Sequence, residues 1–420
     1  MQRFNMKLKT HGIRIEKFIN MSYTTNNTSL FCVLVILSLL SCNRSKTMTK
    51  EQIENNIFSE AEKNSEYEKK LTLEKVGTKS FRIDNSTNYV THYLDIYKSG
   101  NDRFITYQNR DTNCIQFYSF KSEKLEKKIC FPEEGSNGIT KLSGFKVISL
   151  DSIFVVSSVS KAMYLVNEKG EIKNKYDLLQ GDESNNTSTA MIQTKTSSLV
   201  IENDIIYLPG HPDRTPYDEG HPFVAVNLKT KDYEYVGSYT DYYRHHDDGF
   251  WNTIVLNYSH TYNNKDGFLI TSFLGDPYIY KGDPRNTLKE KFLARSERFS
   301  GSLPSNQRNP NSKEFYVSTN HYGFILYDEY RNVYYRMANH ALELYREDGT
   351  PNNLEDKPIS IIILDESLTK VGEVFLPDNK YYFRTMFVEK EGLYISTANY
   401  SNKDLKEDYI EFDIFTTKGL

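Results

Sequence analysis

Several features that would narrow the function are scarce or missing in this 420-residue sequence. Tryptophan occurs once, cysteine occurs four times, and the formal net charge is −4. A protein that binds a nucleic-acid backbone needs clustered Lys and Arg, so we expect no DNA or RNA partner. The sequence also lacks a G-x-S-x-G elbow, an H-E-x-x-H zinc motif, a phosphate-binding glycine loop and an EF-hand. No common catalytic motif points to an enzyme, and we expect neither a metal nor an organic cofactor.

Long apolar runs are missing too, apart from one short run near the N-terminus. Residues 30–40 are apolar but too few for a stable membrane anchor, and they follow a basic segment. The run ends at Leu39-Leu40-Ser41-Cys42, which resembles a bacterial lipobox, whose cysteine becomes the lipidated first residue. We therefore predict a signal peptide over residues 1–42, lipidation of Cys42 and a polar tether over residues 43–68. The alternatives are an ordinary signal peptide with a chance cysteine and a buried helix.

This signal predicts a location in the bacterial cell envelope, with the lipid at Cys42 holding the chain to the outer membrane. Residues 43–46 contain no acidic cluster, so the periplasmic and the surface-exposed orientation both stay open. After cleavage Cys114 and Cys130 remain as a possible disulfide pair. A hairpin that turns at residues 121–124 would place them nearly opposite, and an oxidising compartment permits the bond. A register slip of one residue would instead leave two free thiols.

Aromatic residues, in contrast, are abundant, with 32 Tyr and 24 Phe. Such residues fill half-buried pleated surfaces, which indicates a β-rich protein. The clearest stretch is residues 142–176, where four short apolar or alternating segments are separated by turns such as Asn167-Glu168-Lys169-Gly170. This pattern predicts a meander of four antiparallel strands.

The same four-strand pattern recurs along the chain. The central residues of the second strands are spaced 50 to 66 residues apart, at Phe104, Phe154, Ile206, Phe268, Tyr334 and Tyr394. The sixth unit lacks a fourth strand, whereas residues 71–76 and 79–83 are strand-like and unassigned. We predict an all-β, six-bladed β-propeller of four-stranded antiparallel blades over residues 69–420, with the last blade closed by an N-terminal strand. Seven blades or an open pair of β-sandwiches are the alternatives.

This combination resembles the six-bladed β-propeller lipoproteins of Bacteroidetes-type bacteria. The residues that carry the resemblance are Leu39 to Cys42 and the blade-like stretches at residues 153–176 and 393–415. The resemblance covers most of the mature chain and implies the propeller architecture and the envelope location. The group is largely of unknown function, so it implies no catalytic residues.

Loop lengths predict that one rim of the propeller carries the candidate site. The long connections join second to third strands and each unit to the next, which places them on the same rim. The first residues of the innermost strands should then face the central channel, and the candidates there are His92, His260, His321, Arg384, Lys141 and Lys195. Such groups suit an anionic or polyhydroxylated ligand. A metal held by the three histidines and simple hydrogen bonding between blades are the alternatives.

Two long loops add further candidates on the same rim. The loop over residues 241–251 contributes Tyr243, Arg244, His245 and Trp251, and aromatic faces beside Arg and carboxylates suit sugar rings. The loop over residues 211–222 contributes His211 and Arg214, and its prolines favour a fixed wall over a mobile lid. The alternative for the first loop is that its tryptophan plugs a gap between blades.

The expected function is non-enzymatic binding or scaffolding. We expect a monomer that uses its loop-rich rim and central channel to bind a polar small molecule, a glycan or an envelope protein. The alternative is a carbohydrate-active enzyme, a hydrolase or lyase, with its active site at the mouth of the channel. Two carboxylates and a histidine around an open channel would favour the enzyme, whereas Tyr or Phe side chains there would favour binding. A purely structural lipoprotein would instead expose a large apolar patch.

Overall fold

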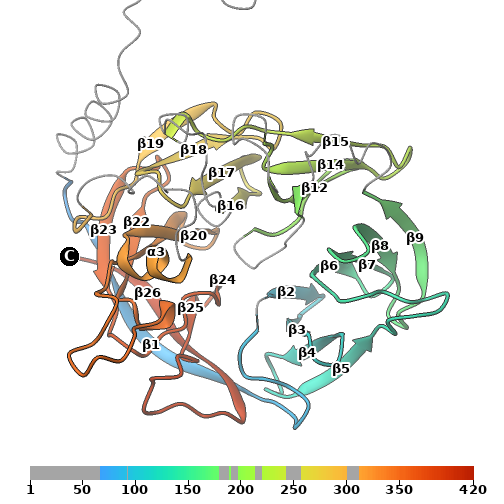
Figure 1. The fold of residues 1–420 in the computed structure, drawn as a ribbon, viewed down its shortest axis with the longest axis horizontal. Helices are drawn as coiled ribbons and strands as arrows, with labels where there is room; N and C mark the ends of the chain where they lie inside the picture. The colour runs from blue at the N-terminus through green and yellow to red at the C-terminus, as the bar shows by residue number, and fades with distance from the viewer. Residues whose placement is uncertain are drawn as a thin grey trace, which may run out of the picture. The chain divides into compact units, whose positions relative to one another are not determined.

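Six four-stranded antiparallel sheets account for most of the strands in this computed structural model. The structure describes residues 67–91, 93–178, 189–190, 197–212, 220–242, 257–299 and 312–420, with backbone only at residues 189–190, 211–212 and 312. Figure 1 shows the sheets around a common centre, with inner strands such as β2 (Leu94–Ser99), β20 (His321–Asp328) and β24 (Met386–Glu389) facing it. The prediction of an all-β, six-bladed propeller with four-stranded antiparallel blades is confirmed.

The first five blades each take their strands in chain order from the inside outward. Blade 1 continues from β2 with β3 (Asp102–Asn109), β4 (Cys114–Ser119) and β5 (Leu125–Cys130). Blade 2 consists of β6 (Gly144–Ser149), β7 (Ser152–Ser157), β8 (Ala162–Val166) and β9 (Ile172–Asp177). Blade 3 consists of β11 (Val200–Glu202), β12 (Ile205–Pro209), β14 (Phe223–Asn227) and β15 (Tyr233–Val236).

Blades 4 and 5 follow the same order. Blade 4 consists of β16 (Tyr258–Asn263), β17 (Phe268–Phe273), β18 (Tyr278–Gly282) and β19 (Glu290–Leu293). Blade 5 continues from β20 with β21 (Val333–Asn339), β22 (Ile359–Leu364) and β23 (Lys370–Phe375). The predicted strands fall within a few residues of these bounds because the turns between them carry strong turn residues.

Blade 6 takes its outermost strand from the other end of the described chain. Its order is β24, β25 (Gly392–Ser396), β26 (Tyr409–Gly419) and then β1 (Leu71–Arg82), with β1 and β26 antiparallel. Beyond blade 6, the backbone N–H of Lys70 donates to the carbonyl of Val371 in blade 5, and the N–H of Arg82 donates to the carbonyl of Glu123 in blade 1. The segment that contains β1 therefore joins three blades across the outside of the ring (Figure 1).

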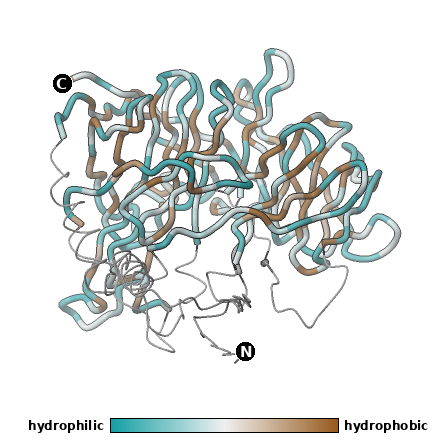
Figure 2. The backbone as a smooth tube through the Cα atoms, turned by 90° about the horizontal axis from the view of Figure 1, so that it is seen from above, coloured by the Kyte–Doolittle hydropathy of each residue, from teal (hydrophilic) through white to brown (hydrophobic). Residues whose placement is uncertain are grey.

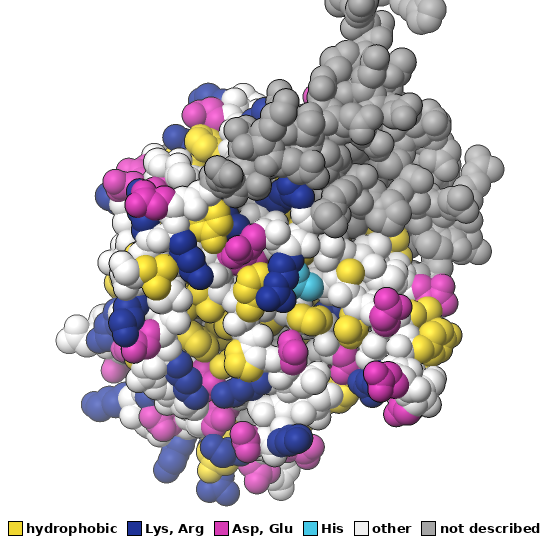
Figure 3. Space-filling view, turned by 90° about the vertical axis from the view of Figure 1, so that its left-hand side faces the viewer, with side chains coloured by type: hydrophobic (Ala, Val, Ile, Leu, Met, Phe, Trp, Pro, Cys, Tyr) yellow, Lys and Arg dark blue, Asp and Glu magenta, His cyan; other side chains and the backbone are white. Residues whose placement is uncertain are grey.

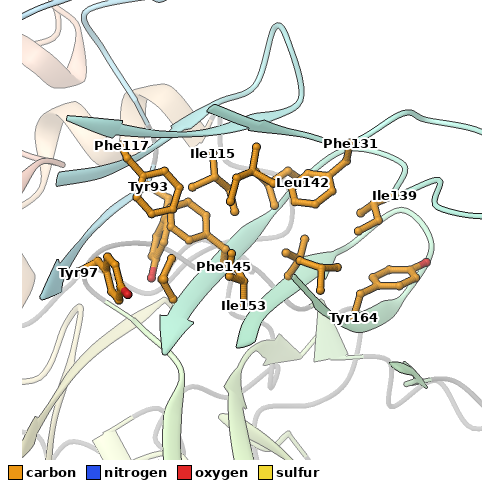
Figure 4. Packing of buried hydrophobic residues seen from close by; sticks show 14 of the residues in the cluster. Tyr93, Tyr97, Ile115, Phe117, Phe131, Ile139, Leu142, Phe145, Ile153 and Tyr164 are labelled. Carbon is orange, nitrogen blue, oxygen red and sulfur yellow. The ribbon is translucent and has the colours of Figure 1, made fainter. Parts of the chain in front are cut away.

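Apolar side chains fill each interface between consecutive blades. Strands β4 and β22 are buried at every position, because each blade lies between two others and has no solvent-facing side there. Figure 4 shows the interface of blades 1 and 2, where the Tyr93 ring meets the Phe145 ring edge-on at 4.9 Å between centroids. Figure 2 shows hydrophobic residues along the strands and hydrophilic residues in the connections. Burying each such aromatic side chain contributes roughly 1.5–3 kcal/mol.

The first and last blades meet through both apolar and charged contacts. Phe120 of blade 1 lies 6.3 Å from Phe387 and 6.1 Å from Tyr394 of blade 6, measured between ring centroids. At the end of β24 the buried carboxylate of Glu389 forms ion pairs with Arg103 at 3.0 Å and with Lys98 at 3.1 Å, both from blade 1. These ion pairs therefore link two blades that are far apart in sequence.

Several long connections contain regular elements that the sequence did not predict. Helix α3 (Ser312–Ser318) precedes β20, and the 3-10 turn η2 (Leu354–Asp356) lies between β21 and β22. A two-stranded pair joins β10 (Thr189–Ala190) to β13 (His211–Pro212). These elements are too short to leave a clear periodic pattern in the sequence.

Cys114 and Cys130 form a disulfide between β4 and β5. The two residues are direct partners in the strand register, which resolves the alternative of two free thiols. The bulge in this hairpin lies at Phe117 and Tyr118, beyond the pair, so it does not shift the cysteines out of register.

The outer surface shows no field of one sign on the face drawn in Figure 3, where Lys and Arg are interspersed with Asp and Glu. Many of these charges form surface pairs, such as Lys418 with Glu74 at 3.1 Å. Among the described residues, no helix has the length and apolar character needed to cross a membrane.

Candidate functional site

Four side chains meet on the loop-rich rim, where the chain leads into the inner strands of blades 4, 5 and 6. Asn257 precedes β16, Tyr316 lies on α3 ahead of β20, and Tyr382 and Arg384 precede β24. We call these four residues the mouth cluster. The Asn257 Nδ2 donates to the Tyr316 hydroxyl at 3.3 Å. The positive charge of Arg384 lowers the pKa of both tyrosine hydroxyls.

A tight turn holds Tyr382 and Arg384 between blades 6 and 1. The N–H of Tyr382 donates to the carbonyl of Ser396 at 2.8 Å, and the N–H of Ser396 donates to the carbonyl of Thr385 at 3.1 Å. The Thr385 hydroxyl in turn donates to the carbonyl of Thr91 in the segment leading into blade 1, at 3.4 Å. Because the turn is bonded to two blades, the backbone of Arg384 is fixed.

The position of Tyr316 depends on a buried lysine at the end of α3. The Lys357 ammonium donates to the carbonyls of Tyr316 and Thr319, and it lies 3.2 Å from His321 Nδ1. A cation at the C-terminal end of a helix satisfies carbonyls that have no partner within the helix. Burial lowers the pKa of Lys357 well below its ordinary value. The lysine therefore positions α3, and it does not reach solvent at the mouth, since it is only 5% exposed.

The tyrosines of the cluster remain protonated at neutral pH. Burial raises the pKa of Tyr316 to about 12, against the opposing effects of the hydrogen bond from Asn257 and the charge of Arg384. Burial also raises the pKa of Tyr382, which Arg384 lowers and Glu355 raises further. Tyr382 is only 6% exposed, and Tyr316 is half-buried.

Arg384 and Asn257 are the exposed members of the cluster, and Arg384 is the one with a positive charge. Its guanidinium lies 5.0 Å from the centroid of the Phe383 ring, and it forms no hydrogen bond or ion pair with another described residue. Other arginines on the propeller have carboxylate partners, for example Arg103 with Glu391 at 2.7 Å. The donors of Arg384 are therefore available to a ligand.

The structure buries two of the histidines that the sequence placed at the channel. His260 is 3% exposed, and its Nε2 lies 2.8 Å from the Ser198 carbonyl oxygen. His321 is 4% exposed, and its ring packs against the Tyr316 ring with 5.3 Å between the centroids. Burial lowers the pKa of His260 to about 4. Neither imidazole presents its nitrogens to solvent, as expected for histidines that bond neighbouring segments.

Of the other predicted site residues, the structure fully describes Lys141, and the rest lie wholly or partly outside the described residues. Lys141 is exposed in the turn before β6, where it has a φ of 48°. The backbone of His211 lies in β13, but its side chain is outside the described residues. Also outside them are His92, Lys195, Arg214, Tyr243, Arg244, His245, Trp251 and the predicted lipidation site Cys42.

A buried chain of hydrogen bonds in blade 5 joins the three side-chain types of a hydrolytic triad, but not in the arrangement of a triad. His340 Nε2 lies 2.9 Å from the Ser360 hydroxyl, which donates to the Glu373 carboxylate at 2.7 Å. In a hydrolase the histidine lies between serine and carboxylate and removes the hydroxyl proton, whereas here the serine lies between the other two. Ser360 is fully buried, so the chain is structural. Among the described residues, no group of three or more His, Cys, Asp or Glu side chains could hold a metal.

Of the residues described at the mouth, the sequence analysis named Arg384 but not Asn257, Tyr316 or Lys357. Tyr316 and Lys357 depend on α3 and on the connection between β21 and β22, whose paths no local pattern reveals. Tyr382 could have been named from the sequence, because it lies two residues before Arg384 in the same segment leading into an inner strand.

The comparisons with known proteins concern the family and the fold. A family model described as a domain of unknown function (DUF4221) matches residues 69–374. A crystal structure of a DUF4221 member from Bacteroides vulgatus ATCC 8482 is 21% identical and aligns with a TM-score of 0.73, covering 84% of this chain and 100% of that chain. A protein of Bacteroides fragilis (BF0058), described as a candidate exported protein, is 13% identical with a TM-score of 0.50, covering 83% of this chain and 95% of that one. No curated protein sequence matches the chain.

Proposed function

Because this chain belongs to the DUF4221 family, whose description leaves its function open, we propose a function from the site itself. The protein is a ligand-binding propeller of the bacterial envelope that takes a polar small molecule or glycan at the mouth cluster. The observation that carries this proposal is Arg384, whose exposed guanidinium has no hydrogen-bond or ion-pair partner among the described residues. It lies on a rigid turn beside two protonated tyrosines.

The groups that define the mouth favour binding over catalysis. Glycoside hydrolysis requires two carboxyl groups at a set separation across the sugar ring. The described mouth is instead built from amide, phenol and guanidinium groups, which are donors suited to recognition. In the described part of the molecule, the one triad-like chain, formed by His340, Ser360 and Glu373, is buried. Its residues are also not in the order that a hydrolase requires.

The proposal is tested by a binding screen on the purified domain over residues 67–420. We expect at least one of a panel of neutral and acidic oligosaccharides to raise the melting temperature, and calorimetry to give a binding constant. Tyr316→Ala should weaken that binding by about tenfold or more, because it removes a donor and an aromatic surface from the mouth. Tyr345→Ala is the matched control, since Tyr345 is a 59% exposed tyrosine in the connection between β21 and β22. A panel without any binder, or equal binding by the Tyr316 variant, would contradict the proposal.

The location in the envelope is the second part of the proposal. It is supported by the lipobox-like Leu39-Leu40-Ser41-Cys42 and by the Cys114–Cys130 disulfide, which fits an oxidising compartment. The description of the Bacteroides fragilis relative as a candidate exported protein agrees with it. The polar segment over residues 43–68 then connects a lipid at Cys42 to a monomeric propeller.

Lipidation of Cys42 can be measured directly in a bacterial host with lipoprotein processing. We expect the full chain to incorporate labelled palmitate and to sediment with the membrane fraction. Cys42→Ser should abolish the label and shift the protein to the soluble fraction, because a signal-peptide-sized apolar run cannot replace the acyl chains as an anchor. Cys32→Ser serves as the control and should leave both readouts unchanged. Labelling that persists in the Cys42 variant would refute the assignment.

A further inference from the structure

We propose that the Cys114–Cys130 disulfide is a site of thiol–disulfide exchange, where a low-molecular-weight thiol attacks the sulfur of Cys130 while the propeller stays folded. This inference goes beyond the proposed binding function, because it concerns the outer strands of blade 1 and not the mouth cluster. It is supported by the exposure of the two cysteines, by the bonds that hold their hairpin and by an acceptor beside Cys114.

The two cysteines differ sharply in exposure. Cys114 on β4 is 2% exposed, whereas Cys130, the last residue of β5, is exposed. Among the described strands β5 is the outermost of blade 1, so no further strand of that sheet covers Cys130. Thiol–disulfide exchange requires access of a thiolate to one of the two sulfurs, and exposed disulfides are the labile ones. Cys130 is therefore the sulfur that a thiolate can reach.

Hydrogen bonds hold the hairpin on both sides of the disulfide. Toward the turn, the ladder between β4 and β5 continues without the cysteines. On the other side, the Phe131 N–H donates to the Asn113 carbonyl at 3.1 Å, and the Asn113 Nδ2 donates to the carbonyls of Phe131 at 3.0 Å and Ile139 at 2.8 Å. The Leu142 N–H donates to the Asn113 Oδ1 at 2.7 Å. Breaking the S–S bond leaves all these bonds in place, so we expect the blade to survive reduction.

The reduced form of Cys114 has a hydrogen-bond acceptor in place. Its sulfur lies 3.0 Å from the carbonyl oxygen of Thr112. In the disulfide this sulfur has no proton, whereas the S–H of a thiol can donate to a carbonyl. Burial also favours the neutral thiol over the thiolate. After cleavage Cys114 is therefore stable as a buried thiol, and Cys130 holds the added group.

The exchange balances with the external thiol as its one co-reactant. A thiolate RS⁻ attacks the Cys130 sulfur, and the electron pair of the broken S–S bond goes to the Cys114 sulfur, which takes a proton from water. The product is a mixed disulfide between Cys130 and R. A second thiol attacks the sulfur of R, releases Cys130 as a thiol and leaves as R–S–S–R. The protein thereby gains the two electrons and two protons that the two thiols lose.

The test uses the full chain with Cys32→Ser and Cys42→Ser, so that Cys114 and Cys130 are the two remaining cysteines. Dithiothreitol is added in native buffer, and free thiols are labelled with a maleimide and counted by mass. We expect a reduction rate proportional to the dithiothreitol concentration, which changes by less than about twofold with urea below the unfolding transition. A rate that rises steeply with urea would show that reduction requires unfolding, and it would overturn the inference.

Single-cysteine variants in the same background identify the reactive sulfur. In native buffer, Cys114→Ser should form a mixed disulfide with oxidised glutathione about a hundredfold faster than Cys130→Ser, because only the first variant keeps the exposed sulfur. In urea above the transition the two rates should converge. Equal rates in native buffer, with urea unfolding curves that show both variants folded, would overturn the assignment to Cys130.

The state of the reduced protein is the last readout. After reduction we expect an unchanged far-UV circular dichroism spectrum and a single urea transition at a lower midpoint, because the chain loses a cross-link over 16 residues and keeps its ladder. Loss of the spectrum on reduction would show that the disulfide holds the blade together, and it would overturn exchange in the folded state.

Discussion

Replacing Arg336 with methionine is expected to lower the free energy of unfolding by about 4 kcal/mol or more, which is the range of severe core substitutions. Arg336 on β21 is fully buried, and its guanidinium donates across the interface to blade 4. The acceptors are the Ser272 hydroxyl at 2.9 Å and the carbonyls of Asp276 at 2.6 Å, Ala294 at 2.9 Å and Pro277 at 3.1 Å. Methionine fills a similar volume but leaves these buried acceptors without donors, and each such loss costs about 1–3 kcal/mol.

Urea unfolding of the domain over residues 67–420 measures this effect. Arg336→Lys is expected to lose most of the same stability, since one ammonium cannot reach acceptors on several sides. Arg285→Met, at an exposed arginine, should change stability by less than about 1 kcal/mol. A small loss in Arg336→Met would show that the carbonyls find other partners.

Acidification from pH 7 to pH 5 is expected to remove about 3–4 kcal/mol of stability through two buried histidines. Burial lowers the pKa of His260 to about 4. The pKa of His340 is also lowered to about 4, first by burial and then by the charges of Arg298 and Lys357, while Glu373 and Asp378 oppose the shift. Burial also lowers the pKa of His321, which adds to the loss of stability on acidification.

The sign follows from proton uptake. An unfolded histidine titrates near pH 6.5, so between about pH 4 and pH 6.5 the unfolded chain binds more protons than the native protein. The free energy of unfolding therefore rises with pH through this window and is lost as the pH falls. Urea titrations at pH 7, 6 and 5 measure the slope, and His260→Gln should reduce it even if the variant is less stable throughout. A slope unchanged by that substitution would place the titrating group elsewhere.

The architecture could be predicted from the sequence because each blade repeats strong local signals. Turn residues such as Asn167 and Gly170 separate short strands, here β8 of five residues and β9 of six, and the repeat of the second-strand residue Phe154 and its equivalents sets the blade size. These inferences required only short-range patterns and a count of strands.

The site was harder to predict because each blade of a propeller is covered by another blade on both of its faces. A polar residue in a strand is usually read as solvent-facing, yet Arg336 and Thr271 are fully buried between neighbouring blades. His260 has the same explanation, since its ring packs against Phe223 of blade 3 and is bonded to the Ser198 carbonyl. Arg384 was identified because it lies in a segment leading into an inner strand, whereas Tyr316 reaches the mouth only through a helix of seven residues held by Lys357.

The pairing of β1 with β26 has a consequence for how the protein is made. Leu71 is among the first described residues to be synthesised, and its register partner Gly419 is among the last. The ribosome must therefore release almost the whole chain before the sixth sheet can assemble, and β1 waits with an open edge that could pair with another molecule. A chain that stops before residue 409 never receives that partner, so truncation there should yield aggregation-prone fragments and not shortened working propellers.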